Sequence, residues 1–195
     1  MALATGVGNV RSVVRALEKA ASNVVIAGTP EEVRKADVLV VPGQGSFGAF
    51  AAALDGGLRD VVLEKIRGGT PYLGICLGLQ ILFEDSEEAP GAKGLGVFAG
   101  SVKRLVPGDE ALPHMGWNRA ERVGDSEMFE SAHYYFAHTY AAAPADPAVN
   151  LATTSYGSQT FTSAVAAGAI VGVQFHPEKS QRAGLGLIQR FFERL

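Results

Sequence analysis

The chain has 195 residues, 47% of them hydrophobic and 19% charged, and a formal net charge of -3. These values predict one globular domain over residues 1–195 and exclude a fibre or a disordered tail. Because no Lys/Arg block occurs, a nucleic-acid partner is not expected. The single cysteine, Cys76, excludes an intramolecular disulfide and favours the cytoplasm. No signal-peptide pattern and no apolar run of roughly 18 residues occurs, so we expect no export and no membrane anchor.

The first half of the chain alternates between helix and strand patterns. Apolar residues at Val10, Val13, Val14 and Leu17, after Asn9 as N-cap, predict a helix over 10–21. We expect further helical segments at 31–36, at 49–67 with an interruption at Gly56-Gly57, and at 77–84. Strands are expected at 24–26, 38–41 and 71–75. Strands separated by helices favour a parallel sheet that is covered on both faces.

The second half has short strand patterns separated by glycine turns. They cover 95–98, 102–105, 134–140, 151–156, 164–167 and 170–175, and a last helix carries Leu185, Leu187, Ile188, Phe191 and Phe192. The sequence therefore predicts an α/β three-layer sandwich, flavodoxin-like, with a mixed, mostly parallel central sheet flanked by helices and a small antiparallel addition.

A glycine-flanked cysteine follows the strand predicted at 71–75. Gly74-Ile75-Cys76-Leu77-Gly78 has the spacing of a nucleophile elbow between a strand and a helix. Side chains at the two glycine positions would clash in so tight a turn. The helix that follows directs free N–H groups at the sulfur, which favours a thiolate and offers the Leu77 N–H to an oxyanion. A lone cysteine is more often part of a core, but this context indicates a nucleophile.

A histidine and a glutamate follow the last predicted strand, in the order His176-Pro177-Glu178. In extended backbone the two side chains face the same side, and Pro177 restricts His176 to that conformation. His176 is then a general base whose imidazole Glu178 orients. Taken alone, the pair also fits a strand end with a solvated carboxylate. Together with Cys76, it predicts a catalytic triad.

The turn at 42–47 reads Pro-Gly-Gln-Gly-Ser-Phe and leaves backbone N–H groups free, so it is either a second oxyanion donor or an ordinary turn. Ser46 is the weaker nucleophile, because no G-x-S-x-G surrounds it. No nucleotide-binding fingerprint occurs. The remaining histidines lack metal-ligand spacing, so we predict no metal and no cofactor; they are His114, His133 and His138.

Two of these motifs resemble the class I, or triad, glutamine amidotransferases: Gly-Ile-Cys-Leu-Gly-Leu-Gln at 74–80 and His-Pro-Glu at 176–178. The segments 8–12, 113–118, 135–140 and 176–181 resemble one branch of that family, the glutaminase subunits of imidazole glycerol phosphate synthase in histidine biosynthesis. The resemblance spans nearly the whole chain. It implies that glutamine is hydrolysed to glutamate and ammonia through a thioester on Cys76.

The resemblance also implies a partner and further site residues. The partner is a separate (β/α)8-barrel cyclase subunit, which uses the ammonia to make imidazole glycerol phosphate and aminoimidazole carboxamide ribotide within a heterodimer. By position, the oxyanion donors are Gly43, Gln44 and Leu77; glutamine is held by Gly45, Gln80, Thr139 and Tyr140; and the partner interface contains Asn9, Trp117, Tyr135, His138 and Lys179. The plainer alternatives are a core position for Trp117 and a solvated charge for Lys179.

The chain departs from the family pattern at two places. Ala2-Leu3-Ala4-Thr5-Gly6-Val7 stands where a longer first strand usually ends in Asp-Tyr-Gly, and Gln44 stands where a small aliphatic residue is common. If the oxyanion peptide flips when the partner binds, an amide side chain at position 44 could change that switch.

Three rival functions remain at this point. A triad amidotransferase that supplies another synthase is disfavoured by the 113–118 segment. A cysteine peptidase or hydrolase on a flavodoxin-like sheet would not need Gln80 or an interface tryptophan. A non-catalytic scaffold would not need Cys76, His176 and Glu178.

Overall fold

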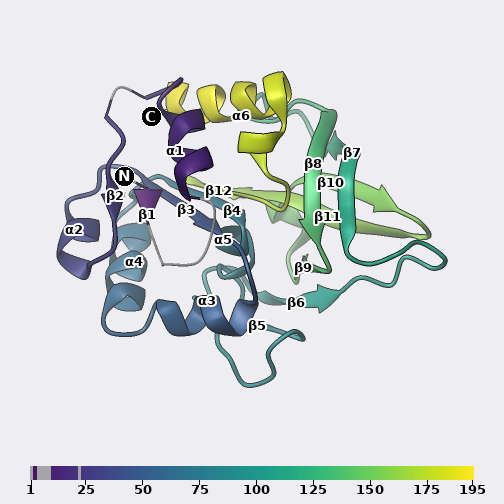
Figure 1. The fold of residues 1–195 in the computed structure, drawn as a ribbon, viewed down its shortest axis with the longest axis horizontal. Helices are drawn as coiled ribbons and strands as arrows, with labels where there is room; N and C mark the ends of the chain where they lie inside the picture. Colours follow the sequence, from purple (N-terminus) through teal and green to yellow (C-terminus); the bar gives the residue numbers. More distant parts are fainter. Residues whose placement is uncertain (1, 4–9, 22) are drawn as a thin grey trace.

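The computed structural model describes residues 2–3, 10–21 and 23–195, and it shows a sheet between two groups of helices (Figure 1). One face is covered by α1 (Val10–Leu17) and α6 (Gln181–Glu193). The other face is covered by α2 (Pro30–Arg34), α3 (Phe47–Ala53) and α4 (Leu58–Arg67). The predicted three-layer α/β fold is confirmed.

The central sheet of the described residues has nine strands in the order β2-β1-β3-β4-β12-β11-β10-β7-β8. They are β1 (Ala2–Leu3), β2 (Ile26–Ala27), β3 (Leu39–Gly43), β4 (Tyr72–Cys76), β7 (His114–Arg122), β8 (Ala132–His138), β10 (Asn150–Tyr156), β11 (Gln159–Ala167) and β12 (Ile170–Val173). From β2 to β12 neighbouring strands are parallel, and from β12 to β8 they are antiparallel. The sheet is therefore mixed, with its helix-covered half parallel.

A small second sheet lies beside the antiparallel half. It contains β5 (Asp85–Ser86), β6 (Gly100–Arg104) and β9 (Tyr140–Pro144), with β6 and β9 antiparallel. Only Thr139 separates β8 from β9, so the chain passes directly from the edge of the large sheet into the small one. A short 3-10 turn, η1 (Pro147–Val149), then leads into β10.

Alternate side chains of the parallel strands pack into two different cores. In β3, Val40 belongs to the core under α1 and α6, whereas Leu39 and Val41 belong to the core over α2, α3 and α4. In β4, Leu73 and Ile75 lie on the α1/α6 side. This alternation explains why both strands are unbroken apolar runs, as expected for strands covered on both faces.

The parallel pairing brings three strand ends to one edge of the sheet. Gly43 at the end of β3 pairs with Cys76 at the end of β4, and Val173 of β12 pairs with Ile75 of β4. In open α/β sheets, binding and catalytic groups gather beyond the carboxyl ends of parallel strands. The turns that follow Gly43, Cys76 and Val173 are therefore neighbours in space.

Several predicted elements differ from the observed ones. The strand predicted at 95–98 is wrong: the backbone N–H groups there bond to Ile81, Leu82 and Phe83 carbonyls, so the segment wraps against the turn after Cys76. The strand at 24–26 reduces to β2, where Ile26 is half exposed. The helix predicted over 10–21 ends at Leu17 as α1.

The structure also contains strands that the sequence patterns missed. β7 spans nine residues with only His114 and Ala120 buried, so its polar and exposed positions concealed it. The sequence patterns also missed β5 and β9, because no strand was predicted over 85–86 or 141–144. The predicted N-cap Asn9 and most of the altered first segment lie outside the described residues.

Phe175 gives a test of the core beneath His176. Its ring is fully buried and stacks on Tyr134 with centroids 4.0 Å apart. Phe175→Ala should lower the free energy of unfolding by about 3–5 kcal/mol, because the truncation leaves a cavity among aromatic rings. Urea titration measures the loss. As a control, Val106→Ala at a 72% exposed position should change stability by less than about 0.5 kcal/mol. Equal losses in the two variants would contradict the packing described here.

Candidate active site

Cys76 sits on a strained turn between β4 and α5 (Leu77–Gln80). Its backbone has φ 55 and ψ −108, a conformation that residues with a side chain rarely adopt. A Cβ on Gly74 would lie 2.3 Å from the Gly78 carbonyl oxygen, and a Cβ on Gly78 would lie 1.8 Å from the Val41 carbonyl oxygen. Both glycines are therefore required by contact with the main chain.

The helix after Cys76 is shorter than its sequence pattern indicates. α5 ends at Gln80, and residues 81–84 form turns in place of the predicted helix over 77–84. With a single turn of aligned peptides, the helix macrodipole adds little field at the sulfur. A thiolate at Cys76 therefore depends on local hydrogen-bond donors and on His176, and not on the helix dipole that the sequence pattern predicted.

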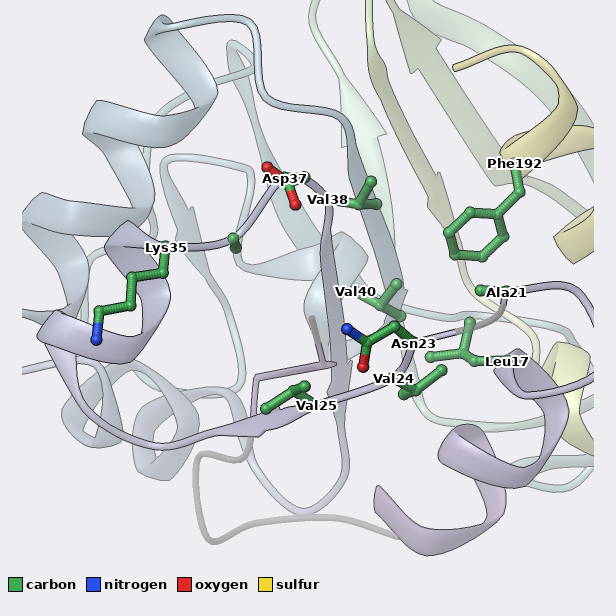
Figure 2. A pocket seen from close by; sticks show the side chains of 11 residues that line it. Leu17, Ala21, Asn23, Val24, Val25, Lys35, Asp37, Val38, Val40 and Phe192 are labelled. Atoms are coloured by element: carbon green, nitrogen blue, oxygen red, sulfur yellow. The ribbon is translucent and has the colours of Figure 1, made fainter.

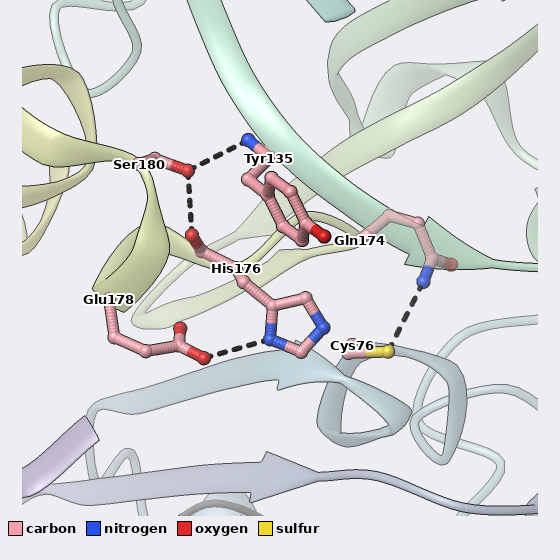
Figure 3. A network of polar contacts seen from close by, with 6 residues as sticks. All are labelled: Cys76, Tyr135, Gln174, His176, Glu178 and Ser180. Atoms are coloured by element: carbon pink, nitrogen blue, oxygen red, sulfur yellow. Dashed lines mark hydrogen bonds and ion pairs between the residues drawn. The ribbon is translucent and has the colours of Figure 1, made fainter. Parts of the chain in front are cut away.

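His176 lies between Glu178 and Cys76 (Figure 3). Its Nδ1 is 2.8 Å from Glu178 Oε1, and its ring faces Cys76, which acts to raise the pKa of the ring. The side chains of His176 and Glu178 are 4% and 1% exposed. His176 keeps the extended backbone expected of it, but residues 177–179 form a 3-10 turn, η2 (Pro177–Lys179), so the pair meets across a turn and not along a strand.

The environment of His176 favours its charged form. Burial acts to lower the pKa of the ring, but the hydrogen bonds and charges of Cys76 and Glu178 outweigh it and raise the pKa to about 9. Since Nδ1 faces a carboxylate, it carries a proton, and Nε2 is left to face the sulfur. The ring is therefore oriented to exchange a proton with Cys76.

The backbone around His176 is fixed by a serine. Ser180 Oγ donates to the His176 carbonyl at 2.6 Å and accepts from the Tyr135 N–H at 2.9 Å (Figure 3). The His176 N–H donates to the Tyr135 carbonyl at 2.9 Å. His176 is thus attached to the edge strand β8. Sequence reasoning missed Ser180, although its position just before α6 is a familiar place for a capping hydroxyl.

The turn after β3 lies next to the triad. A Cβ on Gly43 would lie 2.6 Å from Leu77 Cβ, so the backbone at Gly43 passes against the Cys76 turn, and Gly45 has φ +96. Gly43 and Gln44, together with His176 and Glu178, line a gap that is too narrow to hold a water molecule. Glu178 Oε2 is buried in this region without a hydrogen-bond partner among the described residues.

A buried glutamine pair lies on the other side of Cys76. Gln174 Nε2 is 3.6 Å from Cys76 Sγ, and Gln80 Nε2 is 3.0 Å from Gln174 Oε1 and 2.9 Å from the Tyr140 carbonyl oxygen. The structure therefore places Gln80 and Tyr140 close to the nucleophile. Thr139 connects β8 to β9, and its carbonyl accepts from the Leu105 N–H. Sequence reasoning missed Gln174, although it is two residues before His176.

The residues predicted to meet a partner divide into an exposed group and a buried one. Trp117 is 47% exposed, its ring packs edge-on against Tyr135, and Lys179 Nζ lies 5.6 Å from the Tyr135 ring centroid. His138 is only 6% exposed and hydrogen-bonds to His114 and to the Tyr140 carbonyl. Its side chain faces the interior, so it does not belong to the exposed group, and its role toward a partner stays a prediction. Asn9 lies outside the described residues.

A separate pocket of roughly 230 Å³ lies between α1, α6 and the start of β3 (Figure 2). Its lining is largely aliphatic, with Phe192, and contains no predicted site residue. Among residues 2–3, 10–21 and 23–195, no group of three or more His, Cys, Asp or Glu is placed to hold a metal ion. Within the same ranges, no helix is long and apolar enough to cross a membrane.

Known proteins similar to this chain support the same family. The family model for glutamine amidotransferase class-I matches residues 3–195. Imidazole glycerol phosphate synthase subunit HisH of Pyrococcus furiosus is 43% identical over 95% of this chain and 94% of its own length. The proteins of the same name from Methanothermobacter thermautotrophicus and Deinococcus radiodurans are 44% and 45% identical, over 96% and 95% of this chain and 94% and 89% of their own lengths.

Solved structures agree on the fold. A crystal structure of a glutamine amidotransferase superimposes with a TM-score of 0.78 at 22% identity, covering 99% of this chain and 96% of that one. A structure described as a GMP synthase subunit from Thermoplasma acidophilum gives 0.73 at 17% identity, covering 98% and 91%. The resemblance that the motifs at 74–80 and 176–178 predicted is confirmed, and this chain belongs to the class-I glutamine amidotransferases, in the branch of imidazole glycerol phosphate synthase subunit HisH.

Proposed function

We propose that this chain is the glutaminase subunit of imidazole glycerol phosphate synthase in histidine biosynthesis, with Cys76 as its nucleophile. The observation that carries the proposal is the buried arrangement of His176 between Glu178 and Cys76 on a strained, glycine-flanked turn. An elbow of this kind exposes a nucleophile beyond the sheet edge. The extensive identity to the HisH proteins supports glutamine as the substrate.

The reaction follows from the positions of three groups. His176 Nε2 holds the proton that the thiol gives up, and the sulfur attacks the side-chain amide carbon of glutamine. The His176 proton then passes to the leaving nitrogen, so that ammonia departs and a glutamyl thioester remains. A water molecule, deprotonated by His176, attacks the thioester and releases glutamate with the thiol restored. Glu178 holds the imidazole in the required orientation and stabilises its charged form.

Backbone donors are available for the negative oxygen of the tetrahedral intermediates. The Leu77 N–H follows the nucleophile directly, the Gly43 peptide at the end of β3 lies against it, and the Gln44 peptide comes next in the chain. Donors fixed by a sheet and a tight turn need no reorganisation as charge develops. We assign the oxyanion site to these three residues.

Gln80 is suited to hold the amino-acid end of glutamine. Its two amide protons are used within the protein, on Tyr140 O and Gln174 Oε1, so its Oε1 is left as an acceptor for an ammonium group. We place Gly45, Thr139 and Tyr140 around the same end of the substrate. The main-chain N–H of Gly45, where no side chain intervenes, is suited to donate to the α-carboxylate of the substrate glutamine.

The name of the relatives describes a subunit, and we propose a (β/α)8-barrel cyclase subunit as the partner of this chain in a heterodimer. An exposed aromatic group, Trp117 with Tyr135 and Lys179, offers the surface. Trp and Tyr are among the side-chain types that dominate interface energetics. Ammonia released at Cys76 is used by that subunit.

Glutamate release from glutamine tests the nucleophile. Cys76→Ala should abolish glutaminase activity, because no other thiol exists in the chain, whereas Ser46→Ala should keep it. The assay is run with and without the cognate cyclase subunit and its nucleotide ligand, and we expect the partner to increase the rate. Undiminished activity in Cys76→Ala would contradict the proposed mechanism. Activity that does not depend on the partner would contradict only the expected activation by the cyclase subunit.

The pKa of His176 tests the role of Glu178. Glu178→Gln should bring that pKa down from about 9, because the replacement amide carries no negative charge. The folded-state pKa lies above the ordinary 6.5, so this ion pair stabilises the fold fully below pH 6.5, and the stabilisation is lost as the pH rises through about 9. NMR titration of the ring measures the pKa, and urea titrations at both ends of the window measure the stability. Identical titration of His176 in the two proteins would refute the assignment.

Trp117→Ala tests the interface. The loss of a half-exposed indole that packs against Tyr135 should weaken cyclase binding by about 2 kcal/mol, or roughly 30-fold in Kd. Calorimetry or surface binding measures the change. Val25→Ala, which is 45% exposed and precedes the opposite edge strand β2, is the matched control. An unchanged Kd in Trp117→Ala argues for a different docking face.

A further inference from the structure

We propose that Gln174 is a further catalytic residue: its side-chain amide donates a hydrogen bond to Cys76 Sγ, stabilises the thiolate, and is held in this orientation by Gln80. The inference rests on the proposed function only in taking Cys76 as the nucleophile. It adds a second contact to the sulfur, independent of His176. Neither the family motifs nor the predicted site residues include Gln174.

The contact lies in a closed environment. Gln174 is fully buried, Gln80 is 3% exposed and Cys76 is 7% exposed. Gln174 Nε2 lies 3.6 Å from the sulfur, an ordinary length for an N–H to sulfur bond, and Figure 3 shows the amide and the His176 ring approaching Cys76 from different sides. A donor fixed in a water-poor site interacts strongly with a negative sulfur, because no solvent screens it.

The direction of the Gln174 amide follows from its neighbours. Gln80 reaches the Tyr140 carbonyl oxygen, which can only accept, so the nitrogen of Gln80 lies there and its second proton points to Gln174. The side-chain oxygen of Gln174 must therefore accept the hydrogen bond from that proton. Its nitrogen, with two protons, is then the end that faces Cys76. Turning the Gln174 amide over would place N–H against N–H and its oxygen against a thiolate.

The same carbonyl organises a row of buried side chains that leads away from the site. His138 Nδ1 lies 2.9 Å from Tyr140 O and must donate, so its Nε2 accepts from His114 Nδ1 at 3.0 Å. His114 Nε2 in turn accepts from Asn118 Nδ2 at 3.2 Å. Both rings are neutral, since burial lowers the pKa of His138 to about 3 and of His114 to about 4.

This row ends on β7 beside Trp117, the strand that carries the proposed partner surface. Asn118, His114 and His138 do not contact the sulfur, and their row meets Gln80 at the Tyr140 carbonyl, so they are positioning residues and not catalytic ones. Every member of the row has one allowed direction. The row consists of neutral hydrogen bonds, so it brings no charge that would itself disturb the sulfur.

Alkylation of Cys76 by iodoacetamide tests the bond, because it reports the thiolate without glutamine or partner. Gln174→Met removes the donor at similar size, and Gln174→Glu replaces it by a carboxylate. The alkylation rate at pH 7 should fall about tenfold in Gln174→Met, as for the loss of one hydrogen bond to a charged group, and further in Gln174→Glu. The matched control is Gln189→Glu, the same chemical change at an exposed position of α6, with an unchanged rate.

Folded Gln174 variants that both alkylate within twofold of the unaltered chain would overturn the proposal. If either variant fails to fold, NMR of the unaltered chain decides. The side-chain amide protons of Gln174 should shift with pH in step with the alkylation rate, and this shift should vanish in Cys76→Ala. Equal behaviour of these protons in the two proteins would also overturn the proposal.

The direction of the hydrogen bonds between His114, His138 and the Tyr140 carbonyl can be measured separately. Nitrogen-15 NMR should find His114 and His138 neutral with the proton on Nδ1, and a proton on Nε2 of His138 would refute the row of donors. Failure of the proposed function is distinguishable from all of these outcomes. A chain whose Gln174 variants lose alkylation as expected, but which releases no glutamate from glutamine, would contradict the function and leave the Gln174 contact standing.

Discussion

The parallel pairing of β4 with β3 on one side and β12 on the other determines where the reactive groups of this protein lie. Gly43 pairs with Cys76, and Val173 pairs with Ile75, so the three strands end at the same level. The turns that follow these strands bring the proposed oxyanion loop, nucleophile and base within reach of one another. Because each strand is hydrogen-bonded on both sides, those turns start from fixed points, as a preorganised site requires.

The close approach of backbone around Cys76 is the local consequence. The unfavourable φ of Cys76 persists because Gly74 and Gly78 let α5 pack directly on the main chain of β3 and β4. That packing also sets the direction of the short helix. Gln80, four residues after the nucleophile, is thereby directed at Gln174 beside the sulfur. The elbow therefore positions a second polar group besides the cysteine itself.

Sequence patterns predicted the elements whose signal is local. The buried strands β3 and β4, the glycine spacing at 74–78 and the apolar face of α6 are each visible within a few residues. The 95–98 segment has a strand's apolar pattern, yet its partners are Ile81 and Leu82 carbonyls. Gln174 meets Cys76 across 98 positions, and the burial of His138 depends on strands β7 and β8 pairing. No local pattern contains such contacts, which arise only once the sheet forms.

The buried histidines show how environment divides one residue type into two roles. His138 and His176 are similarly buried, with 6% and 3% of their surface exposed. Burial and neighbouring rings lower the pKa of His138 to about 3, whereas Cys76 and Glu178 raise that of His176 to about 9. The two environments therefore separate a charged imidazole at His176 from a neutral polar row at His138 and His114. A site organised in this way can orient its nucleophile from one side and move its proton on the other.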